Sequence, residues 1–320
     1  MDETRREESD RTVKTARTTF RVLDEVTARE LVGVTELAST LGMSKSAVHR
    51  HLTTLVAEGR IEKHDGEYRR SLRETAGADA VFAVVEALKE LDSATSEEVA
   101  AAIDRSEATA EHYLAWLEDK GYITRRGGTY RNGLKFLDIG ERVKYGTGVF
   151  DIAAEQVDEL AEESGELALM SLLEHGQNVL LYKSHGVDAI QTSHEIGLRE
   201  PLHCSGLGKA ILSKLPRGQV ERIVDEHGLP AFTEHTITDR AELAEELDRT
   251  RERGYAIDDQ EAKPGIRCIA APVVLEERDM YGAVSVTAPE SRMRGERFEE
   301  SLPELVMGAA NVIEVNSIYL

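Results

Sequence analysis

The spacing of apolar and polar residues repeats itself in the N-terminal part of the chain. Residues 17–70 and residues 79–132 follow one pattern at a constant offset of 62 positions, without a gap. Each copy has three stretches with apolar residues at helical spacing, followed by two short strand-like runs. The matching positions include Phe20 and Phe82, Ala38 and Ala100, Ser44 and Ser106, Leu52 and Leu114, Leu55 and Leu117, Gly59 and Gly121, Ile61 and Ile123, and Tyr68-Arg69 and Tyr130-Arg131. The pattern therefore predicts one small module that occurs twice.

The first copy has the order of elements that is typical of a winged helix-turn-helix. Helical spacing predicts helices over residues 20–26, 34–41 and 45–58. Gly42 is suited to end the second helix, and Ser44 is a favourable N-cap for the third. Short strands on either side of Asp65-Gly66 predict a tight hairpin. In such a module the third helix enters the DNA major groove and the hairpin rests on the DNA backbone.

The exposed face of the third predicted helix is where the two copies differ. From the first copy to the second, the changes are Lys45 to Glu107, Ser46 to Ala108, His49 to Glu111 and Arg50 to His112. In the first copy, Arg50 can donate two hydrogen bonds to guanine or to phosphate. We expect DNA contacts from Ser44, Lys45, Ser46, His49, Arg50 and Thr53 on the helix and from Lys63, Arg69 and Arg70 on the wing. The alternative is a solvated basic face in a module that binds protein.

The second copy keeps the scaffold without the basic face. The string Thr95–Glu98 has the spacing of a capping box at the start of its second helix. On its third helix, Glu107, Glu111 and Glu118 would be repelled by phosphates at short range. The hairpin residues Arg125-Arg126 could still touch a DNA backbone. This copy is therefore interpreted as a spacer or dimerisation element, with weak DNA binding as the alternative.

The charge distribution supports this contrast. The chain of 320 residues has a net charge of −21, which taken alone disfavours a nucleic-acid partner. However, residues 11–73 carry a net charge of +4, residues 80–133 carry −4 and residues 134–320 carry −16. The first copy is therefore a basic island in an acidic chain. The diffuse acidic excess is typical of proteins from salty cytoplasm and favours a halophilic archaeal source, with an ordinary solvated acidic surface as the alternative.

Several classes of protein are disfavoured by composition. A hydrophobic fraction of 41% with 31% charged residues is typical of a globular protein. No apolar run approaches the roughly 18 residues needed to span a bilayer, and the string Met1–Glu8 has no apolar core of a secretory signal. Cys204 and Cys268 are the only cysteines, so we expect reduced thiols. These observations predict a cytoplasmic protein without a membrane partner.

Residues 150–320 alternate helix and strand signals, which predicts an α+β domain. We expect helices over residues 151–164, 206–215, 219–227, 240–253 and 298–318, and strands over 167–173, 178–184, 270–276 and 281–287. The string Ser205–Gly208 opens a helix, so its free N–H groups and the helix dipole favour an anion. The alternative for Gly206 and Gly208 is that they allow tight packing of the helix.

Signals for catalysis or for a metal are poor. His203-Cys204 would suit a thiol nucleophile, but adjacent residues on a strand point to opposite faces and cannot pair. The chain has neither a Cys-x-x-Cys nor a His-Glu-x-x-His string. One short acidic turn, Asp258-Asp259 with Glu261, is too little to define a cation site. We therefore expect no enzyme activity, no metal and no cofactor.

Two groups of sequence segments resemble those of the isocitrate-lyase-regulator (IclR) family of transcription factors. They are residues 34–38 and 44–52, and residues 201–210, 254–261, 264–273 and 282–286. The resemblance covers about residues 14–72 and 80–320. It implies DNA binding and a GAF-like sensor domain for a small carboxylate. The implied effector contacts are Gly206, Leu207, Asp258, Ile266, Cys268, Ser285 and Thr287. For Cys268, an inert core thiol remains an equal alternative.

The chain departs from the family in one respect. Members usually carry one winged helix per subunit, and residues 130–140 resemble the family's link between wing and sensor domain. Here that link follows the second copy, whereas the basic face lies in the first.

The fold class expected is α+β, with two tandem winged helix-turn-helix modules followed by a GAF-like effector-binding domain. The expected boundaries are a flexible N-terminus 1–13, modules 14–73 and 79–133, a linker helix 134–149 and the effector domain 150–320. The expected function is a transcriptional regulator, such as a repressor, that binds double-stranded operator DNA as a homodimer or tetramer and responds to a small metabolite. The alternative is a ligand sensor that acts through protein partners and dimerises through its winged helices.

Overall fold

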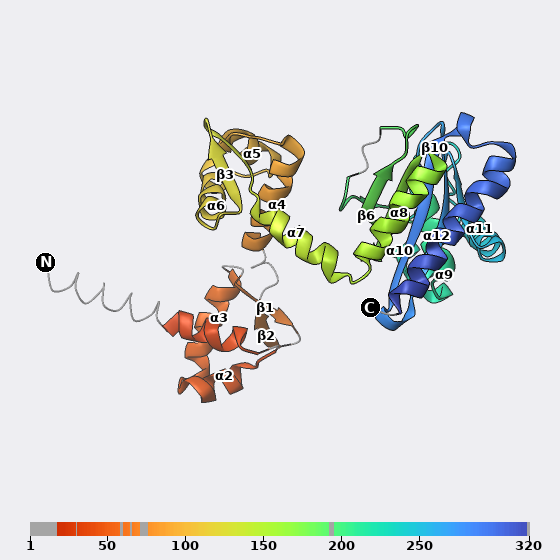
Figure 1. The fold of residues 1–320 in the computed structure, drawn as a ribbon. Coiled ribbons are helices and arrows are strands. Elements are labelled where there is room, and N and C mark those ends of the chain that lie inside the picture. Colours follow the sequence, from red (N-terminus) through yellow and green to blue (C-terminus); the bar gives the residue numbers. More distant parts are fainter. Residues whose placement is uncertain are drawn as a thin grey trace, which may run out of the picture. The chain divides into compact units, whose positions relative to one another are not determined.

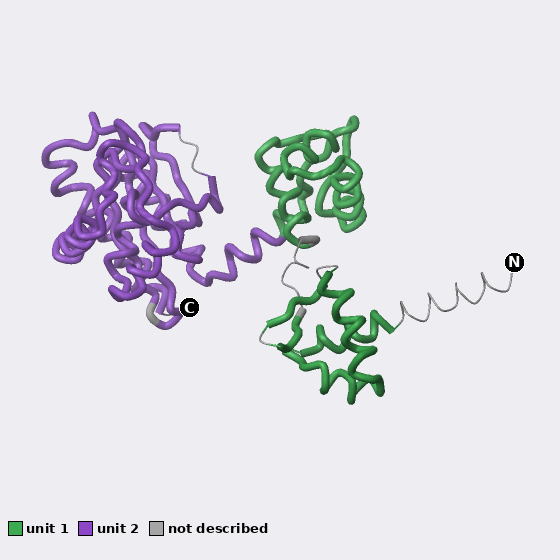
Figure 2. The backbone as a smooth tube through the Cα atoms, turned by 180° about the vertical axis from the view of Figure 1, so that it is seen from behind, with its two compact units in different colours: residues 1–138 green, residues 139–320 purple. Residues whose placement is uncertain are grey.

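The computed structural model describes residues 18–29, 31–57, 60–64, 66–70, 76–191 and 195–318. The chain divides into two compact units, Met1–Asp138 and Ile139–Leu320 (Figure 2). The predicted N-terminal segment 1–13, the turn residue Asp65 and the side chain of Arg70 lie outside the described residues. Each unit is described by itself below.

Residues 18–70, called the first repeat from here on, contain three helices and a hairpin. Residues 18–27 are helical and are followed by α2 (Val34–Leu41), α3 (Lys45–Ala57), β1 (Ile61–His64) and β2 (Glu67–Arg70). Gly42 ends α2 with a φ of +66°, in the left-handed region that favours glycine. The Ser44 hydroxyl accepts a hydrogen bond from the N–H of Ala47 at 3.2 Å. The predicted glycine end of α2 and the serine cap of α3 are confirmed.

Residues 76–132, called the second repeat, have the same order of elements. They are α4 (Ala76–Leu91), α5 (Ser96–Ala102), α6 (Glu107–Asp119), β3 (Ile123–Arg126) and β4 (Thr129–Asn132). The predicted capping box of α5 is present: the N–H of Thr95 donates to the Glu98 carboxylate at 2.8 Å, and the N–H of Glu98 donates to the Thr95 hydroxyl at 3.3 Å. Ser106 caps α6 through the N–H of Thr109, as Ser44 caps α3.

The two repeats have the same interior. Ten residues form the buried cluster of the first repeat, and each has a counterpart 62 positions later in the buried cluster of the second. The first cluster consists of Val22, Val26, Val32, Leu37, Ala38, Val48, Leu52, Leu55, Ile61 and Tyr68. The second consists of Val84, Leu88, Ala94, Val99, Ala100, Ala110, Leu114, Leu117, Ile123 and Tyr130. The constant offset seen in the sequence is therefore an equivalence of packing positions.

The hairpins of the two repeats are anchored in the same way. Val32 forms an isolated bridge with Tyr68, and Ala94 forms one with Tyr130. The backbone N···O distances in these two bridges lie between 2.7 and 3.0 Å. Each hairpin therefore pairs with a third extended segment, which fixes the wing to its helices.

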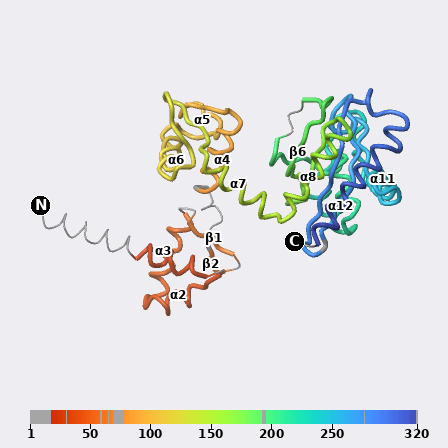
Figure 3. The backbone as a smooth tube through the Cα atoms, viewed as in Figure 1, coloured from red at the N-terminus to blue at the C-terminus, as the bar shows by residue number. Residues whose placement is uncertain are grey.

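The helix predicted in the segment 134–149 is α7 (Lys135–Gly146), which the chain enters directly after β4 (Figure 3). The Lys135 ammonium lies 4.0 Å from the ring centroid of Tyr122 and donates to the carbonyl of Lys120 at 3.0 Å. The Phe136 ring lies 5.4 Å from the same tyrosine ring. The first turn of α7 is thus packed on the second repeat.

The C-terminal unit is built on a six-stranded antiparallel sheet in the order β7-β6-β5-β10-β9-β8. Figure 1 labels two of its strands, β6 and β10, among the helices of this unit. The strands are β5 (Leu167–Glu174), β6 (Gln177–His185), β7 (Arg199–Glu200), β8 (Ala256–Asp259), β9 (Ile266–Leu275) and β10 (Met280–Pro289). The helices are α8 (Phe150–Ser164), α9 (Gly206–Lys214), α10 (Arg217–His227), α11 (Arg240–Arg253) and α12 (Leu302–Ser317).

Helices cover both faces of this sheet. One buried cluster joins α8 and α12 to the sheet, around residues such as Val157, Val284 and Val306. A second cluster joins α9 and α11 to the other face, around Leu207, Ile211 and Leu247. Because both faces are covered, the first five residues of β5 are all buried instead of alternating. The α+β arrangement expected from the sequence is confirmed.

Several boundaries differ from the prediction. The hairpin predicted over 270–276 and 281–287 is longer, because β9 begins at Ile266 and β10 ends at Pro289. The short strands β7 and β8 were not predicted, since their few residues are largely polar. The closing helix α12 begins at Leu302, after a five-residue π-helical turn, and not at Phe298.

Candidate DNA-reading face and ligand pocket

The exposed side of α3 carries the residues predicted to contact DNA. Val48, Leu52 and Leu55 are buried in the core of the repeat. The remaining stripe is exposed, and it contains Ser44, Lys45, Ser46, His49, Arg50 and Thr53. Neither Lys45 nor Arg50 forms an ion pair within the described part of the chain. The helix therefore presents two uncompensated cations beside several hydrogen-bonding groups, which suits phosphates and base edges.

The wing of the first repeat is more constrained than expected. Arg69 lies opposite Glu62 in the hairpin register, and its Nε donates to the Glu62 carboxylate at 2.5 Å. Lys63 lies opposite Tyr68, with its ammonium 5.8 Å from the ring centroid. The guanidinium of Arg69 is therefore already engaged by Glu62, whereas the exposed cation of Lys63 has no carboxylate partner among the described residues.

The equivalent side of α6 is acidic. Ala110, Leu114 and Leu117 are buried, so the exposed stripe corresponds position by position to that of α3. It contains Glu107, Ala108, Glu111, His112, Ala115, Trp116, Glu118 and Asp119. Its geometry matches that of α3, but its charge is of the wrong sign for a phosphate backbone.

A pocket of about 350 Å³ in the C-terminal unit collects six of the seven residues implied as effector contacts. These are Gly206, Leu207, Asp258, Ile266, Cys268 and Thr287. The seventh, Ser285, is completely buried and does not line the pocket, and its hydroxyl has no hydrogen-bond partner within the described residues. The pocket has further lining residues that were not predicted as effector contacts, which are Leu169, Ile190, Gln191, Glu200, Ser205, Ala262 and Lys263.

The start of α9 forms one wall of this pocket, and a side chain at either of its two glycines would collide with a neighbouring residue. A Cβ on Gly206 would lie 2.8 Å from the Cys268 sulfur, at the pocket wall. A Cβ on Gly208 would lie 2.2 Å from the carbonyl oxygen of Leu202. Gly208 is thus required by tight packing, as the alternative interpretation held. The first N–H groups of α9 remain available to an anion, apart from that of Gly208, which donates to the Ser205 hydroxyl at 3.1 Å.

Buried charges lie behind the pocket. Lys209 of α9 forms an ion pair with Glu261, and their side chains are only 1% and 9% exposed. Asp258 accepts a hydrogen bond from the N–H of Glu261 at 2.7 Å. Burial raises the pKa of Asp258 to about 7, and the nearby charge of Glu261 acts in the same direction. A carboxyl group that titrates near neutral pH therefore faces the pocket.

The Lys209–Glu261 pair was not predicted, although the sequence holds a signal for it. Lys209 is the only charged residue in the apolar run between Gly206 and Ser213. A charge inside a buried helix needs a partner, so this position could have prompted a search for one. Its partner lies 52 positions away, which no local pattern reveals.

The two thiols are not activated nucleophiles. Burial raises the pKa values of both Cys204 and Cys268 to about 12. The premise that His203-Cys204 lies on a strand is wrong, because both residues lie in the turn that precedes α9. His203 and Cys204 still do not pair with each other. The His203 ring is hydrogen-bonded to the carbonyl of Pro230, and the Cys204 thiol faces the carbonyl of Pro201.

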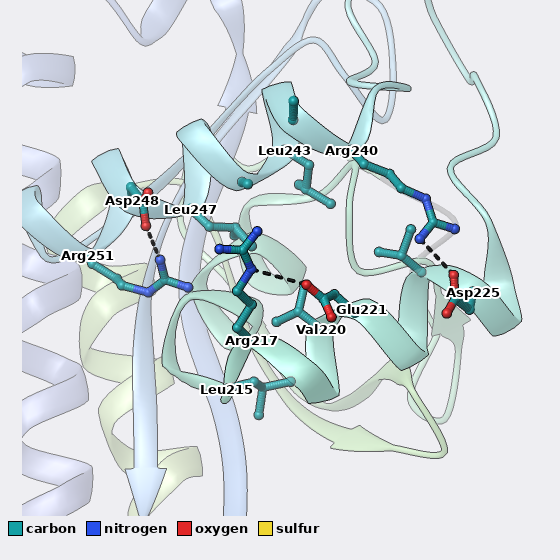
Figure 4. A pocket seen from close by; sticks show the side chains of 13 residues that line it. Leu215, Arg217, Val220, Glu221, Asp225, Arg240, Leu243, Leu247, Asp248 and Arg251 are labelled. Carbon is teal, nitrogen blue, oxygen red and sulfur yellow. Dashed lines mark hydrogen bonds and ion pairs between the residues drawn. The ribbon is translucent and has the colours of Figure 1, made fainter.

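A larger groove of about 710 Å³ lies between α10 and α11 (Figure 4). Leucine and valine side chains such as Val220 and Leu243 line it, and ion pairs such as Arg217 with Glu221 and Arg240 with Asp225 border it. These bordering groups are mostly exposed and already paired with one another. The groove therefore lacks the buried, converging polar groups that distinguish the smaller pocket.

Metal-binding clusters and membrane-spanning helices are both missing from the described residues. Within them, no group of three or more His, Cys, Asp or Glu side chains is arranged to hold a metal ion. None of the helices described is both long enough and apolar enough to cross a membrane.

Two family models match the chain. The model described as "Bacterial transcriptional regulator IclR C-terminal" matches residues 143–315, and the IclR helix-turn-helix domain matches residues 18–65. The second match coincides with the first repeat and its basic face.

Relatives and solved structures agree with the family models. The chain is 35% identical over 256 residues to the probable HTH-type transcriptional regulator ArcR of Halobacterium salinarum, covering 79% of this chain and 96% of that protein. It is 30% identical to the transcriptional repressor IclR of Escherichia coli, covering 64% of this chain and 76% of the repressor. An IclR homologue from Microbacterium hydrocarbonoxydans, solved with 4-hydroxybenzoate, has a similar fold, with a TM-score of 0.65, 20% identity, and 75% and 100% coverage. The resemblance found in the sequence is thus confirmed, and the chain belongs to the IclR family of DNA-binding transcriptional regulators.

Proposed function

We propose that this regulator reads its operator with the first repeat, used as a winged helix-turn-helix with α3 in the major groove. The observation that carries the proposal is that Lys45 and Arg50, on the exposed side of a helix whose other side is buried, have no ion-pair partner among the described residues. Base and phosphate contacts come from Ser44, Lys45, Ser46, His49, Arg50 and Thr53, and phosphate contacts from Lys63, Arg69 and Arg70 on the wing.

The second repeat is proposed to be a winged helix-turn-helix scaffold that does not read DNA and serves as a spacer or dimerisation element. Its ten buried positions support the shared scaffold, and the carboxylates of α6 oppose DNA contact. The match to the Halobacterium relative spans 256 residues of the 320, so roughly one repeat length of this chain lies outside it. This length is in keeping with the proposal that the chain carries one module more than that relative.

The pocket beside α9 is proposed to bind a small carboxylate. Its volume of about 350 Å³ lies at the lower end of the range for small-molecule sites, about 300–1,000 Å³. The start of α9 offers N–H donors, and Lys263 at the rim adds a cation without an ion-pair partner among the described residues. The similar fold solved with 4-hydroxybenzoate, itself a carboxylate, supports this class of ligand.

The regulator is proposed to be a cytoplasmic homodimer or tetramer that recognises a palindromic or repeated operator. A repressor is the favoured mode, because the E. coli relative is named as one. Ligand binding would shift DNA affinity by its differential affinity for two arrangements of the chain, typically about 1–3 kcal/mol.

Changing Arg50 to Ala tests the reading helix. DNA sequences are first selected from a random pool by the wild-type protein, and affinity for a selected duplex is then measured by fluorescence anisotropy. The variant should lose about 1–3 kcal/mol of specific binding, because a helix contact to bases is removed. The matched control is His112→Ala, at the equivalent position of the second repeat. Equal affinities of wild type and Arg50→Ala would disprove the proposal.

The pH dependence of ligand binding tests the pocket. The pKa of Asp258 is raised to about 7, so its carboxyl group is ionised at pH 8 and protonated at pH 6. An ionised Asp258 repels a carboxylate ligand, and binding of 4-hydroxybenzoate, measured by calorimetry, should therefore become roughly threefold to tenfold tighter from pH 8 to pH 6. Asp258→Asn should remove this dependence while keeping the oxygen that accepts from Glu261. Binding that weakens as the pH falls would argue against a carboxylate in this pocket.

A further inference from the structure

The exposed stripe of α6, called the α6 face here, is a helix face without a partner. It is made of Glu107, Ala108, Glu111, His112, Ala115, Trp116, Glu118 and Asp119. The three glutamates fall within a narrow arc of the helix, since positions 107, 111 and 118 are four and seven residues apart. The two alanines lie beside them, and Trp116 lies on the far edge. The face is therefore acidic along one side and carries Trp116 along the other, with the two alanines, Asp119 and His112 between them.

Two carboxylates of the α6 face have no partner in the described part of the chain. Glu107 accepts a hydrogen bond from the Ser96 hydroxyl at 2.9 Å, and Asp119 pairs with Lys120 at 2.7 Å. Glu111 and Glu118 have no ion pair or hydrogen bond from their side chains within the described residues. About 10 Å separates them along the helix axis, given the rise of about 1.5 Å per residue.

Trp116 is the second unexplained feature. It is the only tryptophan in the chain, and 46% of it is exposed. Its counterpart in the first repeat is the small polar Thr54, so the shared scaffold does not require an aromatic residue here. Exposed tryptophan is enriched at the centres of protein interfaces, where its burial contributes much of the binding energy. A solvated acidic surface accounts for the glutamates but not for this ring.

The chain itself carries the complementary surface. The exposed side of α3 presents Lys45 and Arg50, which lie about 7–8 Å apart along the helix axis and form no ion pair with any described residue. Long, flexible Lys and Arg side chains can reach carboxylates at the spacing of Glu111 and Glu118. The small Ser46 and Thr53 side chains between them leave room for close approach of a helix face.

We propose that the α6 face docks on the α3 face of a second copy of this chain. The inference rests on the proposed function in one respect, namely that α3 is the DNA-reading helix. In the docked state Glu111 and Glu118 occupy the positions that phosphates take in the DNA complex. Operator DNA and the second copy then compete for the same two cations, so the second repeat restrains DNA binding by the first.

A charge exchange in the full-length protein tests this docking. The variants are Arg50→Glu, Glu111→Lys, and the two combined, with Glu90→Lys on α4 as a control for net charge alone. Glu90 is exposed, and its side chain is only weakly paired with Lys89 at 3.9 Å. Self-association is measured without DNA by sedimentation, and the exposure of Trp116 is measured by acrylamide quenching of its fluorescence. Since Trp116 is the sole tryptophan, the quenching reports this face alone.

In the wild type, quenching should increase on dilution as Trp116 leaves the interface. Each single exchange should weaken the association about tenfold, equivalent to about 1.4 kcal/mol, and the double exchange should restore it to within about threefold of wild type. The Glu90→Lys control should associate like wild type. Quenching that is independent of concentration, or a double exchange no better than either single one, overturns the proposal.

A separate measurement distinguishes failure of this inference from failure of the proposed function. Wild-type binding to a duplex selected from a random pool is compared with that of Arg50→Ala at a protein concentration below that of self-association, so that it tests only whether α3 reads DNA. If that loss is observed while the charge exchange fails, α3 reads DNA and the α6 face is not its competitor. If Arg50→Ala binds DNA like wild type, the reading role itself is wrong.

Discussion

The first and second repeats have the same interior and opposite exteriors. Their ten buried positions coincide at a constant offset of 62, and both hairpins are held by the same backbone bridge to a tyrosine. On the third helix, however, Lys45 and Arg50 stand where the second repeat has Glu107 and His112. The comparison teaches that the fold of such a module is set by a few packed positions, whereas its partner is set by side chains that contribute almost nothing to the core.

The largest expected effects test whether the interiors are equivalent. Leu52 and Leu114 are both completely buried at matching positions. Replacing either with Ala leaves a cavity, so each change should destabilise its own repeat by about 2–5 kcal/mol, with the two costs within about 1 kcal/mol of each other. Hydrogen exchange of peptides from α3 and α6 measures each repeat separately. A large loss in one repeat with almost none in the other would break the comparison.

A smaller difference lies at the start of the second helix of each repeat. Thr95 caps α5 with its side chain, whereas its counterpart Gly33 gives α2 no side-chain cap. Thr95→Ala should cost the second repeat about 1 kcal/mol. Gly33→Thr should stabilise the first by a few tenths of a kcal/mol, because Glu36 is placed to complete a capping box and a Cβ at Gly33 meets no atom within 4 Å. Urea unfolding followed by circular dichroism measures the stability of both variants. If Gly33→Thr were less stable than wild type, the starts of α2 and α5 would not be equivalent.

The smallest expected effect concerns the exposed faces of α3 and α6 and is measured as the salt dependence of DNA binding. The double variant Glu107→Lys with His112→Arg places the charges of α3 on α6. If α6 does not lie on the duplex, no further phosphate is neutralised, and the slope of log affinity against log salt concentration should stay unchanged. Binding titrations with a selected duplex at several salt concentrations measure this slope. A slope steeper by about 0.9 for each added cation would mean that the second repeat already faces DNA.

Much of the fold follows from local pattern. The helices 34–41 and 240–253, the end of α2 at Gly42 and the capping box at Thr95 were all predicted correctly, because their signals lie within a few residues of one another. Strand β8 was missed, since its polar residues are held by pairing with β9 and not by their own pattern. The start of α12 was misplaced because the apolar pattern runs without a break through a π-helical turn.

The pocket could be predicted only through the family resemblance. Gly206, Asp258 and Thr287 come from three separate segments that meet through the sheet and α9. No spacing along the chain shows that they converge. Arg69 was assigned to phosphate alone, because its pairing with Glu62 depends on the register of the hairpin.

The buried pair of Lys209 and Glu261 has a mechanical consequence for the pocket. Separating such a pair leaves an uncompensated buried charge, at a cost of about 3–5 kcal/mol. That exceeds the coupling free energy of a typical effector, about 1–3 kcal/mol. The start of α9 and the turn after β8 are therefore held together as one rigid body that ligand binding cannot pull apart. Any movement that a ligand causes must come from other lining residues, such as Ile190 and Gln191, or must carry this rigid body as a whole.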